Sequence, residues 1–65
     1  MKRVLICDDE PQILRALTVL LRDAGFQAVP TATAEEALEA ASLRPLDAAI
    51  IDLLLSQGSS ATRQP

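Results

Sequence analysis

The sequence has no histidine and only one cysteine, Cys7, so it lacks the side chains that build most catalytic triads and transition-metal sites. A single cysteine cannot form an intramolecular disulfide. Cys7 lies in an apolar run and is expected to be a small buried hydrophobic residue in a reducing compartment. Phe26 is the only aromatic residue, so the core must be aliphatic and thin. These absences exclude structural zinc, histidine-dependent catalysis and a disulfide-stapled fold.

Long apolar runs and an excess of positive charge are absent too. No stretch approaches the roughly 20 apolar residues of a membrane span, and the first short run, at residues 4–7, is cut off by three acids. We therefore expect a cytoplasmic protein without a signal peptide. Nine acidic and six basic residues give a net charge of −3, which disfavours direct binding to nucleic acid or an anionic membrane. At 65 residues, the chain allows one small domain.

The first half of the sequence predicts a strand, a helix and a second strand. Residues 4–7 form a short, continuously apolar run, typical of a strand buried on both faces of a parallel sheet. Pro11 suits the first turn of a helix, and Gly25 suits its C-terminal cap. A short strand is expected at residues 26–29, with Pro30 marking it as an edge strand. The apolar stripe of the helix comprises Ile13, Ala16, Leu17, Leu20, Leu21 and Ala24.

The second half predicts another helix and another strand. Thr33 and Glu36 have the spacing of a capping box, which begins a helix that ends near Arg44. Thr31, just before it, is expected in a loop. A further apolar run at residues 48–51 predicts the third strand. The order strand, helix, strand, helix, strand predicts an α/β fold with three parallel strands joined by right-handed crossovers. Residues 56–65 have no periodicity and are expected to form a disordered tail.

Acidic residues follow two of the predicted strands. Asp8 and Asp9 come directly after the first strand, and Asp52 follows the third. Parallel strands would bring these residues to the same carboxyl-terminal edge, where open α/β sheets bind ligands. Crowded carboxylates favour a hard cation such as Mg²⁺. The other interpretation is that these acids are ordinary polar loop and capping residues, and the pattern alone leaves both open.

Three segments together resemble a known family. The run from Val4 through Asp8-Asp9-Glu10-Pro11, then residues 34–38, then Asp47 through Asp52-Leu53, are similar to the amino-terminal half of bacterial two-component response-regulator receiver domains. The likeness covers residues 2–55, which we take as a partial receiver domain. It is greatest to regulators with a winged-helix DNA-binding output domain. The family fold is flavodoxin-like, with five parallel strands in the order 2-1-3-4-5, so the resemblance implies a truncated form with the order 2-1-3.

The resemblance also implies roles for individual residues. Asp52 matches the aspartate that accepts a phosphoryl group from a sensor histidine kinase. Asp9 and Asp52 match the Mg²⁺ ligands, together with the backbone carbonyl of Leu54, and Asp8 matches a neighbour that acts mainly through water. The function implied is phosphorelay signal transduction by a phosphoprotein, with no enzymatic activity of its own.

The sequence departs from the family after Leu55. The family's lysine and its switch serine or threonine have no counterpart, which is the pattern of a truncated or frameshifted receiver. We therefore expect weak or no activity from the chain alone. An alternative function is a non-catalytic fragment that associates with itself or with another receiver through the exposed edge of the third strand. A phosphatase with an aspartate nucleophile ranks last, because Leu54 stands where its second acid would be.

Overall fold

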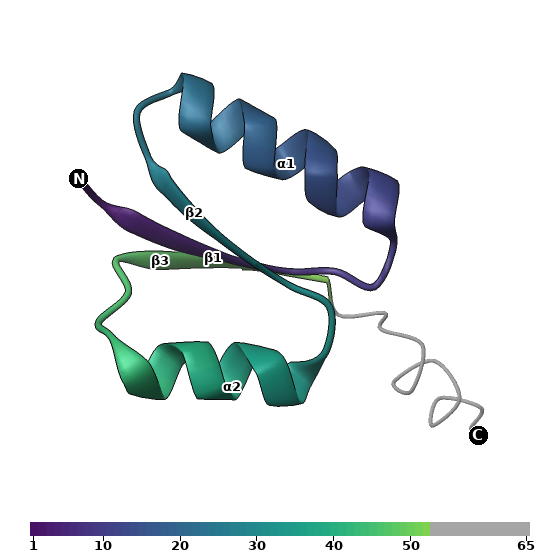
Figure 1. Cartoon of the computed structure of the whole chain (residues 1–65), viewed down its shortest axis with the longest axis vertical. Coiled ribbons are helices and arrows are strands. Elements are labelled where there is room, and N and C mark those ends of the chain that lie inside the picture. The colour runs from purple at the N-terminus through teal and green to yellow at the C-terminus, as the bar shows by residue number, and fades with distance from the viewer. Residues whose placement is uncertain (53–65) are drawn as a thin grey trace.

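A computed structural model describes residues 1–52, which form a three-stranded parallel sheet with one helix on each face. The central strand is β1 (Arg3–Cys7), with β2 (Gln27–Thr31) on one side and β3 (Ala48–Ile51) on the other (Figure 1). The observed order β2-β1-β3 confirms the predicted α/β, truncated flavodoxin-like arrangement. It also confirms that the strand containing Pro30 lies at an edge.

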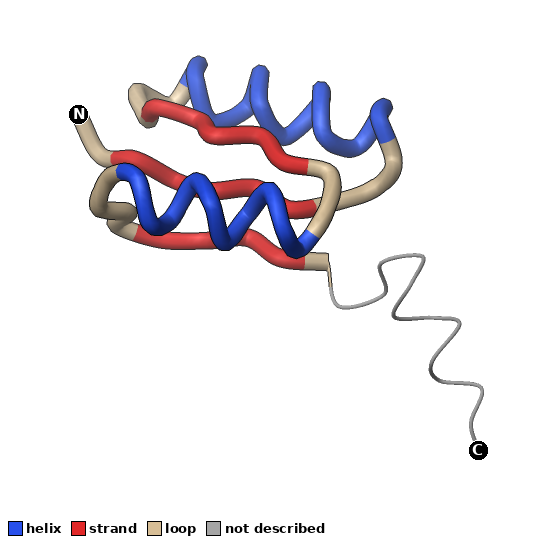
Figure 2. The backbone as a smooth tube through the Cα atoms, turned by 60° about the horizontal axis from the view of Figure 1, so that its bottom comes forward, coloured by secondary structure: helices blue, strands red, loops and turns tan. Residues whose placement is uncertain are grey.

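The two helices cover opposite faces of the same two strands. Helix α1 (Pro11–Asp23) and helix α2 (Ala34–Leu43) each pack on β1 and β2 (Figure 2). A right-handed crossover puts its helix on a face that depends on the direction in which the chain moves across the sheet. The chain first moves from β1 to β2 and then back past β1 to β3, so the two helices lie on opposite faces.

The helix ends follow the predicted capping chemistry. Pro11 occupies the first turn of α1, and Gly25 adopts a left-handed φ of 94° beyond its last turn. Gly25 N donates to Arg22 O at 3.0 Å and Phe26 N to Leu21 O at 2.9 Å, which is a Schellman motif. At α2, Glu36 N donates to Thr33 Oγ1 at 3.1 Å. The Glu36 carboxylate reaches back to Ala32 N rather than to the cap residue itself.

The core is formed almost entirely by β1. Its four apolar residues are at most 5% exposed, which confirms the prediction of a strand buried on both faces. Leu5 and Cys7 face α2, and they pack against partly buried apolar residues of β2, α2 and the loop before β3. The sheet covers the apolar stripe predicted on α1 only in part, because no residue of this helix is fully buried. Leu20, a member of that stripe, is 65% exposed, since α1 covers β1 and β2 but does not reach over β3.

Two smaller details differ from expectation. Strand β2 begins one residue later than predicted and continues through Pro30 to Thr31, so Thr31 is a buried strand residue rather than a loop residue. The predicted tail at residues 56–65 lies outside the described residues, as does Leu54. Among residues 1–52, no helix is long and apolar enough to cross a membrane.

Candidate metal and phosphoryl-acceptor site

The strand register brings the predicted acidic residues together. Cys7 is aligned with Ile51 in the parallel β1–β3 pair, so the residues that follow, Asp8 and Asp52, leave the sheet side by side. Asp52 N donates to Cys7 O at 2.8 Å, which continues the ladder by one more hydrogen bond. Asp9 is the next residue along the loop toward α1. The expected convergence at the carboxyl-terminal edge is therefore present in the structure.

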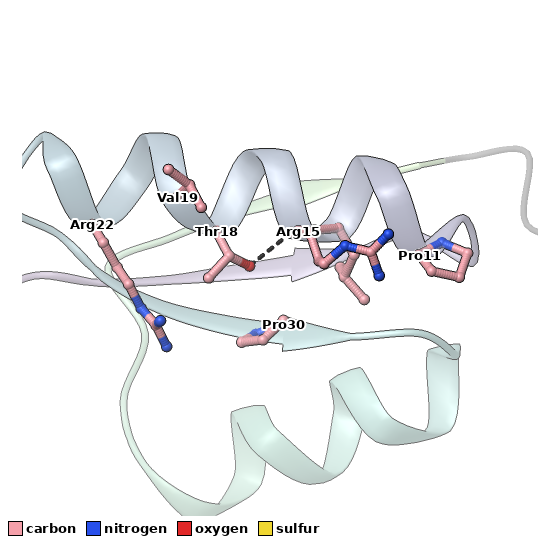
Figure 3. A pocket seen from close by; sticks show the side chains of 7 residues that line it. Pro11, Arg15, Thr18, Val19, Arg22 and Pro30 are labelled. Atoms are coloured by element: carbon pink, nitrogen blue, oxygen red, sulfur yellow. Dashed lines mark hydrogen bonds between the residues drawn. The ribbon is translucent and has the colours of Figure 1, made fainter.

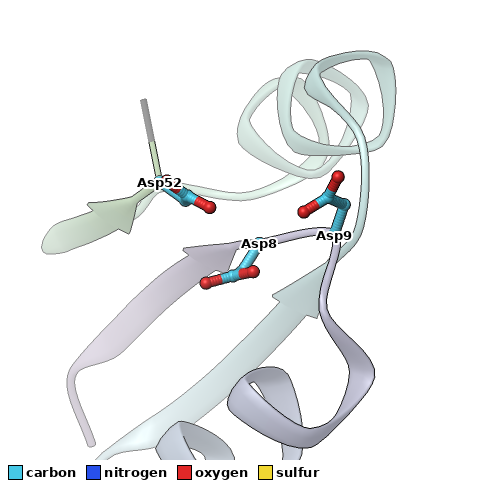
Figure 4. A group of neighbouring side chains, drawn as sticks. All are labelled: Asp8, Asp9 and Asp52. Carbon is cyan, nitrogen blue, oxygen red and sulfur yellow. The ribbon is translucent and has the colours of Figure 1, made fainter. Parts of the chain in front are cut away.

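The three carboxylates form a compact cluster. Each of Asp8, Asp9 and Asp52 offers one carboxylate oxygen, and these three oxygens lie within 4.8 Å of one another. Figure 4 shows the side chains of Asp9 and Asp52 turned toward each other, with Asp8 beside them. All three residues are partly buried; the Asp8 carboxylate is the most enclosed and that of Asp9 the most open. The cluster is thus a concentrated negative site that solvent can still reach.

Hydrogen bonds fix the position of Asp8. Its backbone N donates to Thr31 O at 3.1 Å, and its Oδ1 accepts from Glu10 N at 2.9 Å. Glu10 is the N-cap residue of α1, and its own side chain makes no capping hydrogen bond. The Asp8 side chain therefore ties the end of β1 to the start of α1, which restrains the loop that carries Asp9.

Sequence reasoning missed Thr31 as a support of this site. Thr31 is only 6% exposed, and its hydroxyl donates to Ile6 O at 2.7 Å. Its carbonyl accepts from Asp8 N. The same residue thus ties the end of β2 to β1 at the point where Asp8 begins. No local signal could have revealed this role, because the partner of the hydroxyl lies 25 residues away in the sequence.

The spacing of the oxygens suits a small, hard cation. Mg²⁺ binds oxygen ligands at about 2.1 Å, which puts neighbouring ligands about 3 Å apart and opposite ligands about 4.2 Å apart. Oxygens within 4.8 Å of one another reach those separations with small side-chain adjustments, or with a water molecule in place of one direct contact. The residues present therefore fit the ion that the sequence suggested.

Comparison with known proteins bears on the origin of this arrangement. Over 53 residues, the chain is 49% identical to the transcriptional regulatory protein KdpE of Mycobacterium tuberculosis, in strain CDC 1551 / Oshkosh and in strain ATCC 25618 / H37Rv. KdpE is a response regulator with an N-terminal receiver domain. The chain is related to response regulators. The aligned segment is 82% of this chain and 24% of KdpE, so the chain spans about a quarter of the length of the curated relatives it matches.

This response-regulator relationship agrees with the fold. The β2-β1-β3 sheet with one helix on each face is the arrangement expected of a receiver fragment. No family model matches the chain, and no solved structure matches it. The relationship therefore rests on the similarity to KdpE, and the fold agrees with it independently.

Proposed function

We propose that the chain acts in phosphorelay signal transduction, with Asp52 as the residue that accepts a phosphoryl group. The observation that carries this proposal is the convergence of Asp8, Asp9 and Asp52 at the carboxyl-terminal edge of the sheet. In the transfer, a carboxylate oxygen of Asp52 attacks phosphorus, and the bond from phosphorus to the kinase's histidine nitrogen breaks. The partner is accordingly a sensor histidine kinase, and the setting is the cytoplasm.

We further propose that Asp9 and Asp52 hold Mg²⁺ directly, with Asp8 acting through water and the carbonyl of Leu54 as a further ligand. The first three residues lie in the described cluster, whereas Leu54 lies outside it. Bound Mg²⁺ would neutralise charge on the phosphoryl oxygens. Asp8, held by Glu10 N, keeps the loop in place so that Asp9 stays beside Asp52.

The activity of these 65 residues by themselves is proposed to be weak or absent. Their single lysine, Lys2, precedes β1 and so lies at the end of the sheet opposite to Asp52. A phosphoryl group on Asp52 would therefore have no lysine beside it within the described part of the chain. We propose accordingly that the chain alone is not an enzyme and produces no output, and that it makes no direct contact with nucleic acid or a membrane.

A phosphorylation assay tests the proposal. The chain is incubated with phosphoramidate, with and without MgCl₂, and its intact mass is measured over time beside that of an Asp52→Asn variant. We expect a small, short-lived fraction of the wild-type chain to gain one phosphoryl group only when Mg²⁺ is present, and none of the variant to do so. Modification that persists in the variant, or that does not need Mg²⁺, would refute the assignment of Asp52.

The exposed edge of β3 favours a second candidate function, association with a second copy or with another receiver. All four residues of β3 are exposed, and among residues 1–52 this strand pairs only with β1. Proline and charged residues normally protect an edge strand from pairing with another chain, and β3 contains neither. Edge pairing would also cover Ile50 and Ile51, which are 42% and 52% exposed.

Sedimentation velocity over a range of concentrations tests this second function. We expect the chain to form dimers or larger species, and Ile50→Lys to shift the population toward monomer. The control Leu38→Lys places the same charge at an exposed apolar residue on α2, away from the β3 edge. A wild-type chain that stays monomeric, or two variants with equal effects, would argue against association through β3.

A further inference from the structure

A groove lies between α1 and the edge strand β2, separate from the acidic cluster. Its volume is about 410 Å³, within the range of small-molecule binding pockets. None of the three aspartates of the cluster lines it. The groove is lined by Pro11, Leu14, Arg15, Thr18, Val19, Arg22 and Pro30 (Figure 3).

The only charged groups in this lining are two arginines. Arg15 and Arg22 are seven residues apart on α1, about 10 Å along the helix axis. They extend from the helix on either side of Pro30 (Figure 3). Within residues 1–52, neither guanidinium forms a hydrogen bond or an ion pair. The groove therefore presents two guanidinium groups, one toward each end, that have no protein partner among residues 1–52.

The surface between the arginines is apolar. Leu14, Val19 and Pro30 contribute apolar side chains. Thr18 offers no free hydrogen-bond donor, because its hydroxyl donates to Leu14 O at 2.7 Å. An apolar surface between two arginines is complementary to a ligand with an apolar body and an anionic group at each end.

Pro30 determines how a peptide could occupy the groove. Gln27 N donates to Lys2 O, so the amide of residue 27 points toward β1. Neighbouring amides in a strand point in opposite directions, so the amide of residue 30 would point outward from the sheet. Proline has no amide hydrogen, so the outer edge of β2 lacks this donor for an added strand. Sheet extension along this edge is therefore weakened, which favours a partner held by its side chains.

We propose that this groove binds an acidic peptide segment, with carboxylates on Arg15 and Arg22 and an apolar side chain between them against Pro30. In a polyproline II segment, which has three residues per turn and rises about 3.1 Å per residue, residues three positions apart lie on the same side about 9 Å from each other, which is close to the spacing of the arginines. Each guanidinium can bind a carboxylate through two parallel hydrogen bonds. The chain has a net charge of −3 and so does not attract an acidic segment over long range. The attraction must come from short-range contacts with Arg15 and Arg22. This binding site is independent of the proposed phosphoryl-acceptor role.

Fluorescence anisotropy with a defined peptide tests the proposal. The probe is fluorescein-labelled Glu-Leu-Val-Glu-amide, and the control peptide is Gln-Leu-Val-Gln-amide with the same label. We expect the 65-residue chain to bind the acidic probe about tenfold more tightly than the control peptide, because two exposed charge-assisted contacts contribute a total of about that factor. Binding should weaken as salt is added.

Matched variants locate the site. The double variant R15Q/R22Q should lose about tenfold in affinity for the acidic probe. K2Q/R44Q makes the same change in net charge at two residues that do not line the groove, and it should bind like the wild type. Both pairs are surface substitutions, and a ¹H–¹⁵N correlation spectrum verifies that the fold is retained.

Three results would overturn the proposal. The first is equal binding of the two peptides, and the second is an equal loss of affinity in the two double variants. The third is binding to phosphatidylglycerol vesicles that R15Q/R22Q abolishes, in the absence of peptide binding. That third result would assign the groove to a lipid surface.

Discussion

Replacing Asp52 by asparagine should make the chain more stable when no divalent cation is present. The substitution removes one of three negative charges whose oxygens lie within 4.8 Å of one another. At that distance, two unit charges repel by about 0.9 kcal/mol in water and by about 3.5 kcal/mol at an effective dielectric constant of about 20. Asp52 faces two other carboxylates, and solvent reaches the cluster, so the lower value applies to each pair. We expect the free energy of unfolding to rise by about 1–2 kcal/mol.

Magnesium should reverse the order of stability. A cation that binds only the folded state stabilises it by an amount that rises with the logarithm of its concentration relative to Kd, about 2.7 kcal/mol at a hundred-fold excess over Kd. The wild-type chain should therefore gain stability as MgCl₂ is added, whereas D52N, which has lost a ligand, should gain much less. Urea denaturation followed by far-UV circular dichroism, at several MgCl₂ concentrations, measures both effects.

Glu39→Gln is the matched control for this experiment. It makes the same change in net charge on the exposed surface of α2, away from the cluster. If E39Q stabilises the chain as much as D52N, the gain comes from net charge and not from the cluster. If Mg²⁺ stabilises wild type and D52N equally, the ion does not bind where the three aspartates meet, and the reasoning from their geometry fails.

Three further substitutions test the fold. Ile6→Ala should destabilise the chain by about 2–5 kcal/mol, enough to remove the thermal unfolding transition, because Ile6 is fully buried in a very small core; L38A, at a residue 72% exposed, should leave the transition within about 1 kcal/mol of wild type. Thr33→Ala should cost about 1 kcal/mol in urea denaturation, since the Thr33 hydroxyl caps α2, and no loss would contradict that role. Gly25→Ala should cost about 1 kcal/mol through its left-handed φ alone, as nothing lies within 4 Å of the added Cβ; a stabilised variant would refute this.

Much of the fold follows from local features of the sequence. The continuous apolar run in β1 predicted that this strand is buried on both faces. The acidic residues after β1 and β3 predicted the carboxylate cluster, because the carboxyl ends of parallel strands meet at one edge of the sheet. Pro30 predicted an edge strand. Each of these signals depends on a few adjacent residues, so the sequence alone was enough to interpret them.

The features that sequence reasoning missed depend on contacts between distant residues. The spacing of apolar residues on α1 shows that the helix is amphipathic, but not that the sheet beneath it leaves Leu20 exposed. Thr31 acts through a carbonyl on another strand, which no spacing rule reveals. Likewise, the sequence alone gives no reason to regard Arg15 and Arg22 as more than solvated residues on a helix surface. Only the structure shows that they line a groove together with Pro30.

The most direct test of the central claim is a ¹H–¹⁵N correlation spectrum of the 65-residue chain, titrated with MgCl₂. The claim is that Asp8, Asp9 and Asp52 form one cation site at the carboxyl-terminal edge of the sheet. We predict a dispersed spectrum in which the amide signals of these three residues shift together and saturate, while those of α2 stay in place. A collapsed spectrum that does not respond to Mg²⁺, or shifts spread evenly over the chain, would contradict the claim.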